Sequence, residues 1–382
     1  MLRHWLALAL AFCPVAAAAN ATAAAQPNAA APTARERWQT GDGRITFTPA
    51  GVAFPRRAGI LQSDRFQEFS VPGQGLDNGL QYRSRDGRSI ATVYVYYPGL
   101  PHSGFAAWAT DNAIRANSAS RVEATGSRVV AAGGVPGVAI RMDYSNYRNG
   151  NASSAVFVKA GRWIVKLRVT GPSPREVNAA MDELLAGIRW GASNPPQPAT
   201  PVTVAAACTG DPGSRAARAL PDPNPNELAA YAMLGTFDGG GIEAREEGGA
   251  RVRLPSRIPP ELCLSSRLAS GVPILRSAEG DQPSIDGRTR LLAVLSDAGA
   301  ALEIVYPRNI GRYLLLYHQI GETSLLGTFD GVPSDRQIAD IIEGRDRESA
   351  RVRALVRLRP GAGDQIHLNV PDEPAEPARP VT

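Results

Sequence analysis

Apolar residues recur at intervals of three and four after Ser173, which is the period of a helix that buries one face. The residues with this spacing are Val177, Ala180, Met181, Leu184, Leu185 and Ile188. Ser173 and Glu176 form a capping box around Pro174, a residue type favoured at the first helical position. A similar apolar stripe follows the expected N-cap Ser103 and comprises Phe105, Trp108, Ala109 and Ala113. We therefore predict two helices in the first half of the chain.

Runs rich in β-branched and aromatic residues lie around these helices and predict strands. Short turn sequences such as Asp86-Gly87 and Asn149-Gly150 separate them at the spacing of hairpins. The expected strands are 90–97, 121–132, 138–147, 152–159 and 162–170. Because hairpins join antiparallel neighbours, this half should form a mainly antiparallel sheet with the helices packed on it.

The second half of the chain shows a similar pattern. Strands are expected at 290–296, 301–306 and 312–320. Ser334 and Gln337 form another capping box, followed by the helical apolar residues Ile338, Ile341 and Ile342. The predicted fold class is α+β, with two domains, each a mainly antiparallel sheet with helices packed on it, preceded by a signal peptide.

Composition sets the expected domain boundaries. Clustered prolines at 192–225 predict a linker between a first domain, 35–191, and a second domain, 226–370. Uncharged residues rich in Ala, Pro and Asn at 22–34 predict a disordered tether, and the proline-rich tail 371–382 is expected to be disordered too.

The segment 1–21 has the features of a secretory signal peptide. A basic start precedes an uncharged apolar stretch, and small residues follow, with cleavage expected near Asn20 or Thr22. The apolar stretch is shorter than the roughly 20 residues that span a bilayer, and no later segment reaches that length. Phe12 stands before Cys13, where lipidation needs a small residue, so we favour cleavage and a periplasmic or secreted protein without a transmembrane span.

Composition otherwise excludes classes of function. The formal net charge is +5, and only two of the 41 basic residues are lysines. We attribute the arginine bias to GC-rich bacterial coding, so it does not indicate a nucleic-acid partner. The histidines lack the spacing of zinc ligands, and the sequence has no hydrolase nucleophile elbow and no phosphate-loop motif. We therefore predict no metal and no cofactor.

Two cysteines, Cys208 and Cys263, remain after removal of Cys13 with the signal peptide. In an oxidising compartment, such a pair favours a disulfide over a metal site or a reactive thiol. We predict a Cys208–Cys263 disulfide that holds the end of the linker on the second domain.

The sequence Leu-Gly-Thr-Phe-Asp-Gly occurs twice, at 234–239 and 326–331, and Ala-Arg-Val-Arg follows each copy some residues later. This repetition predicts a duplicated half-domain in which the copies occupy equivalent places. Asp238 and Asp330 precede glycine in the copies, as in a turn whose aspartate accepts backbone N–H groups. Paired carboxylates can also act as acid and base, so these two are the candidate carboxylate site of a hydrolase.

Alternation at 351–359 places arginines on one face of a predicted strand and apolar residues on the other. The arginines are Arg351, Arg353, Arg357 and Arg359. Such a ridge of guanidinium groups is suited to bind phosphate or carboxylate groups of an anionic envelope polymer. The alternative is a solvated face paired with nearby acids, and the lack of interleaved aromatic residues argues against nucleic acid.

Two smaller clusters complete the candidates. His318 forms the best polar cluster with Glu322 and Asp330, although a hydrogen-bonded core histidine is the simpler interpretation. Tyr94 and Tyr96 share a strand face, as core residues or as a stacking platform for sugar or peptide.

The layout of the first domain resembles the PsbP-like and DcrB-like α/β/α sandwiches. The shared order is a hairpin of aromatic strands, a helix, several antiparallel strands, a basic-flanked strand at 161–170 and a final amphipathic helix. This family consists mostly of exported accessory or partner-binding proteins, so the resemblance implies a fold and no catalytic residues. We expect an exported, non-catalytic binding or accessory protein of the bacterial envelope, whose partner is an unknown envelope protein or polymer. An envelope hydrolase is the alternative.

Overall fold

The computed structural model describes residues 34–71, 73–116, 122–209, 215–237, 243–245, 251–253, 256–278, 288–307, 310–360 and 365–371. They belong to one compact unit, Pro32–Thr382. The predicted signal peptide, the tether up to residue 33 and the tail beyond 371 lie outside these ranges.

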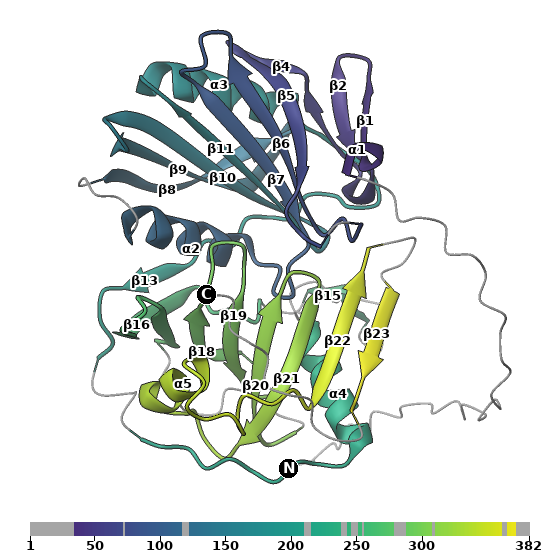
Figure 1. Ribbon diagram of the computed structural model, residues 1–382, viewed down its shortest axis with the longest axis vertical. Coiled ribbons are helices and arrows are strands. Elements are labelled where there is room, and N and C mark those ends of the chain that lie inside the picture. The colour runs from purple at the N-terminus through teal and green to yellow at the C-terminus, as the bar shows by residue number, and fades with distance from the viewer. Residues whose placement is uncertain are drawn as a thin grey trace, which may run out of the picture. The chain divides into compact units, whose positions relative to one another are not determined.

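The first half of the unit forms an eight-stranded sheet in the order β4-β5-β6-β7-β11-β10-β9-β8, shown in Figure 1. Every neighbouring pair in it is antiparallel, as predicted. The strands are β4 Arg57–Ala58, β5 Leu61–Glu68, β6 Asp77–Ser84, β7 Ile90–Tyr96, β8 Glu123–Ala132, β9 Val135–Tyr147, β10 Asn151–Ala160 and β11 Trp163–Gly171. The strands expected between 90 and 170 are thus confirmed to within a few residues.

Both predicted helices form, and they cover opposite faces of this sheet. The helices are α2, Ser103–Ala116, and α3, Pro174–Gly187. The α3 residues Val177 and Met181 share a core cluster with Val95, whereas Ala107 of α2 shares another with Tyr96, the next residue of β7. Successive strand residues point to opposite faces, so α2 and α3 lie on opposite sides.

A smaller four-stranded sheet adjoins the α3 side of the core. Its strands are β1 Trp38–Gly41, β2 Arg44–Phe47, β3 Val52–Pro55 and β12 Arg189–Trp190, with the short helix α1 Ala34–Arg37 before β1 and a 3-10 turn at Thr48–Ala50. The Phe47 and Trp163 rings meet edge to face at 5.5 Å, which joins this sheet to β11.

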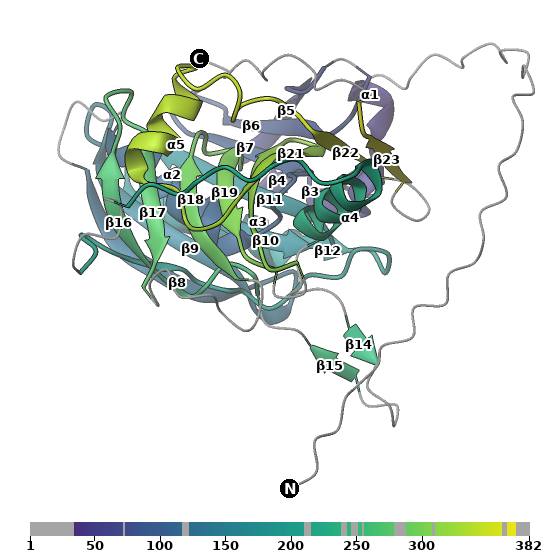
Figure 2. The same ribbon diagram turned by 90° about the horizontal axis from the view of Figure 1, so that it is seen from below.

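The second half of the unit forms a nine-stranded sheet in the order β13-β16-β17-β18-β19-β20-β21-β22-β23. In Figure 2 its labelled strands, β16 to β19 and β21 to β23, follow one another in this order. Only its pair β13–β16 is parallel. The strands are β13 Thr203–Ala205, β16 Glu261–Arg267, β17 Pro273–Ser277, β18 Thr289–Val294, β19 Ala301–Val305, β20 Tyr313–Gln319, β21 Glu322–Phe329, β22 Ala354–Arg359 and β23 Gln365–Asn369. A separate hairpin consists of β14 Glu243–Arg245 and β15 Arg251–Arg253.

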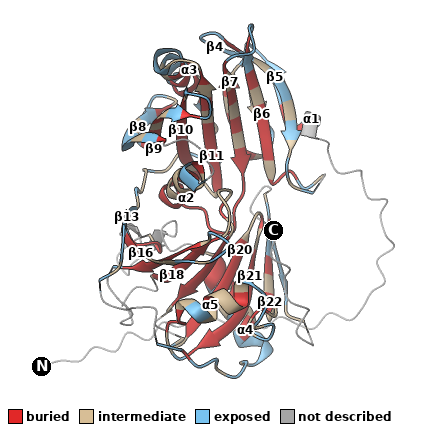
Figure 3. Cartoon of the chain, turned by 60° about the vertical axis from the view of Figure 1, so that its left-hand side comes forward, coloured by how far each residue is buried: buried red, intermediate tan, exposed pale blue. Residues whose placement is uncertain are grey.

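Two helices cover this second sheet from opposite faces. Leu228 of α4, Pro225–Thr236, shares a core cluster with Leu316 of β20. Ile338 of α5, Asp335–Ile342, shares another with Leu315, the preceding residue. Figure 3 shows the central strands of this sheet buried along most of their length. The α+β class, with mainly antiparallel sheets and helices packed on them, is therefore confirmed.

The two large sheets contact each other directly within the unit. Phe105 of α2 packs with Leu275 of β17, so α2 has a sheet on each side (Figure 1). The Gly99 N–H donates to the Gln319 carbonyl at 2.6 Å, and the Gly321 N–H donates to the Tyr97 carbonyl at 2.7 Å. The boundary between two independent domains stays a prediction for proteolysis to test.

The predicted linker, 192–225, makes hydrogen bonds over part of its length. Its residues 203–205 form β13, which pairs with β16. Pro196 bridges to Ala160 of the first sheet, and Ala219 bridges to Phe329 of the second. These parts of the segment are therefore fastened to both sheets.

The two copies of the repeated sequence do not occupy equivalent places, so the predicted structural duplication is wrong. Leu234 lies at the end of α4, whereas Leu326 lies in β21. Asn224 and Glu227 form a capping box that starts α4, and no such signal precedes the second copy. Tertiary context outweighs six identical residues, because the same side chains can pack in a helix or in a strand.

Candidate functional site

The predicted arginine ridge is divided in the structure. β22 begins at Ala354, so Arg351 and Arg353 precede the strand and do not share its outer face with Arg359. Most of these guanidinium groups bind carboxylates of the chain itself. The pairs are Arg351–Glu348 at 3.1 Å, Arg353–Asp222 at 2.6 Å, Arg353–Glu348 at 3.0 Å and Arg357–Glu322 at 3.4 Å. The arrangement therefore agrees better with the alternative, in which the arginines are paired with nearby acidic residues, than with a free anion-binding ridge.

Of the two candidate aspartates, the structure places one, because Asp238 lies outside the described residues. Asp330 directly follows β21 and is exposed. Its carboxylate accepts a hydrogen bond from the Arg218 N–H at 2.8 Å and lies 3.3 Å from the Arg218 Nε. The Asp330 N–H donates in return to the Arg218 carbonyl at 3.1 Å. Asp330 therefore anchors a distant segment to the end of the strand.

His318 is fully buried, with partners other than those predicted. Its Nε2 lies 2.8 Å from Glu303 Oε2, and its Nδ1 lies 3.0 Å from Thr323 Oγ1. Arg257 Nη2 lies 2.8 Å from the same Glu303 oxygen. The antiparallel register of β19 and β20, which sets Ala301 opposite His318, brings Glu303 into reach. Sequence spacing alone does not reveal that register.

A carboxylate, an imidazole and a hydroxyl in this order have the arrangement of a catalytic triad. Here Glu303, His318 and Thr323 are all without solvent exposure, so a substrate has no access to them. Burial would raise the pKa of Glu303, but Arg257 and the His318 hydrogen bond outweigh it and lower that pKa. Burial lowers the pKa of His318 despite its carboxylate partner. The cluster is a sealed structural network of the sheet, and the core-histidine interpretation is confirmed.

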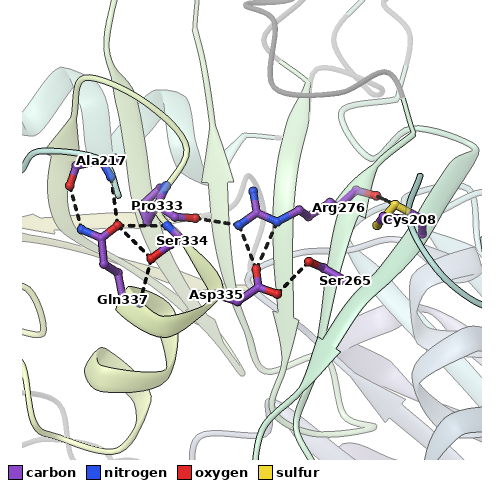
Figure 4. A network of polar contacts seen from close by, with 9 residues as sticks. Cys208, Ala217, Ser265, Arg276, Pro333, Ser334, Asp335 and Gln337 are labelled. Atoms are coloured by element: carbon purple, nitrogen blue, oxygen red, sulfur yellow. Dashed lines mark hydrogen bonds and ion pairs between the residues drawn. A yellow bond between two sulfur atoms is a disulfide. The ribbon is translucent and has the colours of Figure 1, made fainter. Parts of the chain in front are cut away.

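Cys208 and Cys263 form the predicted disulfide, with Cα atoms 4.9 Å apart. Cys263 lies opposite Arg276 on the neighbouring strand. The Arg276 guanidinium is 1% exposed and donates from Nη2 and Nε to Asp335 Oδ1, at 2.8 and 3.1 Å (Figure 4). Ser265 Oγ donates to the other Asp335 oxygen at 2.7 Å. The disulfide and the first residue of α5 are thus joined through one buried arginine.

The same network fastens the chain that follows the disulfide. Gln337 caps α5 together with Ser334, and its amide makes two hydrogen bonds to the Ala217 backbone, at 2.9 and 2.7 Å (Figure 4). All the polar groups of this network bind within the protein, which indicates a structural role.

The face of the eight-stranded sheet opposite α3 is covered by α2 only in part. Figure 3 shows β5, at the far side from α2, largely exposed. A hollow of about 170 Å³ lies on this uncovered part. Its lining residues come from β5, β6 and β7 and the turn after β5, and they are Arg65, Gln67, Phe69, Gly79, Gln81, Thr92 and Tyr94. We take this hollow as the candidate functional site.

Two aromatic rings form the apolar part of the hollow. The Phe69 and Tyr94 ring centroids are 5.6 Å apart, with an angle of 34° between the rings. Gly79 lies directly opposite Tyr94, and a Cβ atom on Gly79 would lie 2.7 Å from Phe69 Cε2. Phe69 therefore occupies the space that glycine leaves, and it remains 44% exposed.

Polar side chains stand beside these rings in the register of the sheet. Gln67 lies opposite Gly79, Arg65 lies opposite Gln81, and Gln81 lies opposite Thr92. The Gln81 Oε1 atom is buried and accepts no hydrogen bond from the residues described. Buried amide oxygens normally have a partner, so this atom favours a bound water or ligand group nearby.

A buried lysine lies beside the hollow, opposite Tyr94 on the neighbouring strand β11. Lys166 Nζ is 5.4 Å from the Tyr94 ring centroid and 2.7 Å from Asp297 Oδ2, which belongs to the turn between β18 and β19. Asp77 is close enough to interact electrostatically with both. Burial raises the pKa of Asp77 to about 7, and Lys166 opposes the rise while Asp297 adds to it.

The two interpretations of the tyrosine pair apply to one residue each: core packing describes Tyr96, and the platform describes the placement of Tyr94. Tyr94 lines the hollow, but Tyr96 is 2% exposed and packs in the core under α2. Phe69 and Gly79 were missed, because their pairing depends on the register of β5 with β6 rather than on a local motif.

A scan against protein-family models and searches of the curated proteins and of the solved structures give no match to this chain. Within the described residues, no helix is long and apolar enough to cross a membrane. Over the same ranges, no three His, Cys, Asp or Glu side chains are grouped so as to hold a metal ion.

Proposed function

We propose that this chain is an exported, non-catalytic binding or accessory protein of the bacterial envelope, and that it binds its ligand on the open face of the eight-stranded sheet. The observation that carries the proposal is the hollow around Phe69 and Tyr94. There an exposed ring, a phenol, two amides and a guanidinium converge on one surface. A few polar groups around an apolar contact are typical of ligand sites.

The other polar candidates favour binding over catalysis. Asp330 is occupied by Arg218, and the triad-like cluster of His318 is sealed in the core. Export is supported by the features of 1–21 and by the Cys208–Cys263 disulfide, since such bonds persist in oxidising compartments. The order of elements in the first half supports the proposed likeness to the PsbP-like and DcrB-like sandwiches.

The test combines localisation with binding. We would express the full chain in a Gram-negative host, release the periplasm by osmotic shock and determine the N-terminal residue of the released protein. The same protein would then be incubated with the host's envelope fraction, beside Tyr94→Ala and the control Tyr231→Ala. Tyr231 is a half-buried tyrosine on α4, away from the hollow.

The proposal predicts a periplasmic protein that begins near Asn20 or Thr22. It also predicts envelope material bound by the parent chain and by Tyr231→Ala, and markedly less bound by Tyr94→Ala. A protein that keeps Met1 in the cytoplasm, or binding that is equal in all three chains, would contradict it.

A further inference from the structure

We propose that the hollow binds one pyranose ring of an acidic glycan, with the ring against Phe69 and Tyr94 and the carboxylate near Arg65. This inference rests on the proposed function and names the ligand class of the same site.

The mixture of side chains favours a sugar over a lipid or a purely ionic ligand. The face of a pyranose carries C–H groups that pack on an aromatic ring, while its hydroxyls point outward around the edge. Phe69 and Tyr94 provide the rings, and the amides of Gln67 and Gln81 stand at the side. An amide has two donors and an acceptor with two lone pairs, so it can bind neighbouring hydroxyls in pairs.

The aromatic surface is held in place before any ligand arrives. Gly79 leaves the space in which the Phe69 ring lies, and the Phe69 N–H donates to the Asp77 carbonyl at 2.8 Å. Lys166, opposite Tyr94 on β11, contacts the Tyr94 ring from the side and holds it in place. A surface fixed in this way loses little conformational freedom on binding, which strengthens the affinity for a given contact area.

The charge at the hollow favours an acidic ligand. Its lining residues include Arg65 and no carboxylate. Two neighbouring cations are paired, Arg83 with Asp64 and Lys166 with Asp297. A third, Arg168, lies opposite Thr92 and stacks on the Tyr147 ring, so it adds positive charge beside the hollow. Arg65 is exposed, and no carboxylate among the described residues pairs with it. A carboxylate on the ligand would form an ion pair with the Arg65 guanidinium.

The size and openness of the hollow set how a glycan would bind. Its 170 Å³ is below the roughly 300–1,000 Å³ of pockets that enclose drug-sized ligands. One sugar ring is therefore in contact at a time, and the open face lets the polymer continue in both directions. Single units should bind weakly, and affinity for the polymer should rise through repeated engagement.

The experiment is an NMR titration of the ¹⁵N-labelled mature chain. The measured quantity is the chemical-shift change of the backbone amides of β5, β6 and β7. The ligands are methyl glucuronide, methyl glucoside and acetate, which separate the sugar ring from the carboxylate. The variants are Phe69→Ala, Gly79→Ala and Arg65→Gln. The matched controls are Ile60→Ala, an exposed apolar residue outside the hollow, and Arg57→Gln, an exposed arginine on β4.

We expect the glucuronide to shift these amides at lower concentration than the glucoside, and acetate to shift them least. Phe69→Ala and Gly79→Ala should weaken both glycosides by about two- to ten-fold, because each removes or displaces the ring. Arg65→Gln should reduce the preference for the glucuronide by up to about five-fold and leave the glucoside unchanged. Both controls should bind like the parent.

Two outcomes would overturn the inference. If acetate gives the same shifts as the glucuronide, the hollow is an anion site and the sugar assignment is wrong. If neither glycoside shifts the amides of β5–β7, the hollow binds no pyranose. The proposed function would survive that second result if envelope material still bound in a Tyr94-dependent way, and it would fail with the inference if such binding were absent too.

Discussion

Asp77 should make the protein less stable at alkaline than at acidic pH. Asp77 begins β6 opposite Tyr96, and burial raises its pKa from 3.8 to about 7. A group with a raised pKa in the folded state contributes stability below its unfolded pKa. That stability is lost as pH rises from the unfolded pKa to the folded pKa, because the unfolded chain has then released a proton that folding must take up again. Replacement by asparagine keeps the neutral form at every pH.

The size of the effect follows from this difference in pKa. At about 1.4 kcal/mol per pKa unit, the shift from 3.8 to about 7 corresponds to a destabilisation of about 4 kcal/mol at pH 8. At pH 5, the same relation gives about 2 kcal/mol, because few unfolded molecules still carry the proton. The gain in unfolding free energy for Asp77→Asn should thus be about 2–3 kcal/mol larger at pH 8 than at pH 5.

Urea unfolding of the parent chain and Asp77→Asn at both pH values, at constant ionic strength and with the disulfide intact, measures this difference. Comparing the two gains removes effects of the substitution that do not depend on protonation. Asp42→Asn, in the exposed turn between β1 and β2, is the matched control and should show no such difference. An equal gain at the two pH values for Asp77→Asn would mean that Asp77 does not take up a proton on folding.

Three other predictions concern stability and organisation. Replacing Cys208 and Cys263 by serine should lower the unfolding free energy by about 4 kcal/mol in the chain-entropy model for a separation of 55 residues, and unchanged urea unfolding would contradict this. Trp163→Ala should cost about 3–5 kcal/mol, since its ring is 1% exposed between Phe47 and Tyr97, whereas Trp108→Ala on the half-buried side of α2 should cost clearly less in the same assay. Limited proteolysis should cut first within 192–225, between the points that fasten this segment at Pro196, 203–205 and Ala219, because its clustered prolines limit regular hydrogen bonding. A first cut inside 90–190, detected by mass spectrometry, would contradict the proposed boundary.

Local sequence signals were sufficient to predict elements whose ends are set by residues close to them in the sequence. The start of α3 was predictable, because Ser173 accepts the Glu176 N–H and Pro174 fits the first helical position. The disulfide followed from the number of cysteines and the predicted compartment. The repeated six-residue sequence gave a wrong prediction of structural duplication, because packing around α4 and β21 decides the structure of each copy.

The candidate site was largely beyond prediction from the sequence. Tyr94 is a possible platform residue from the sequence alone. Its neighbour Phe69 reaches it only because Gly79 of β6, which lies opposite Tyr94, leaves space for the Phe69 ring. The partner of His318 likewise depends on the pairing of β19 with β20. Strand register is a long-range property, and a single sequence does not specify it locally.

Photo-crosslinking in cells would show whether the exported chain binds an envelope ligand on its open sheet face. A benzophenone amino acid would replace Gln67, an exposed residue of the hollow, and in a second strain Ala179, an exposed residue of α3 on the opposite face. We expect adducts between the periplasmic protein and envelope glycan from position 67 and none from position 179. Adducts from position 179 alone, or equal adducts from both positions, would contradict this expectation.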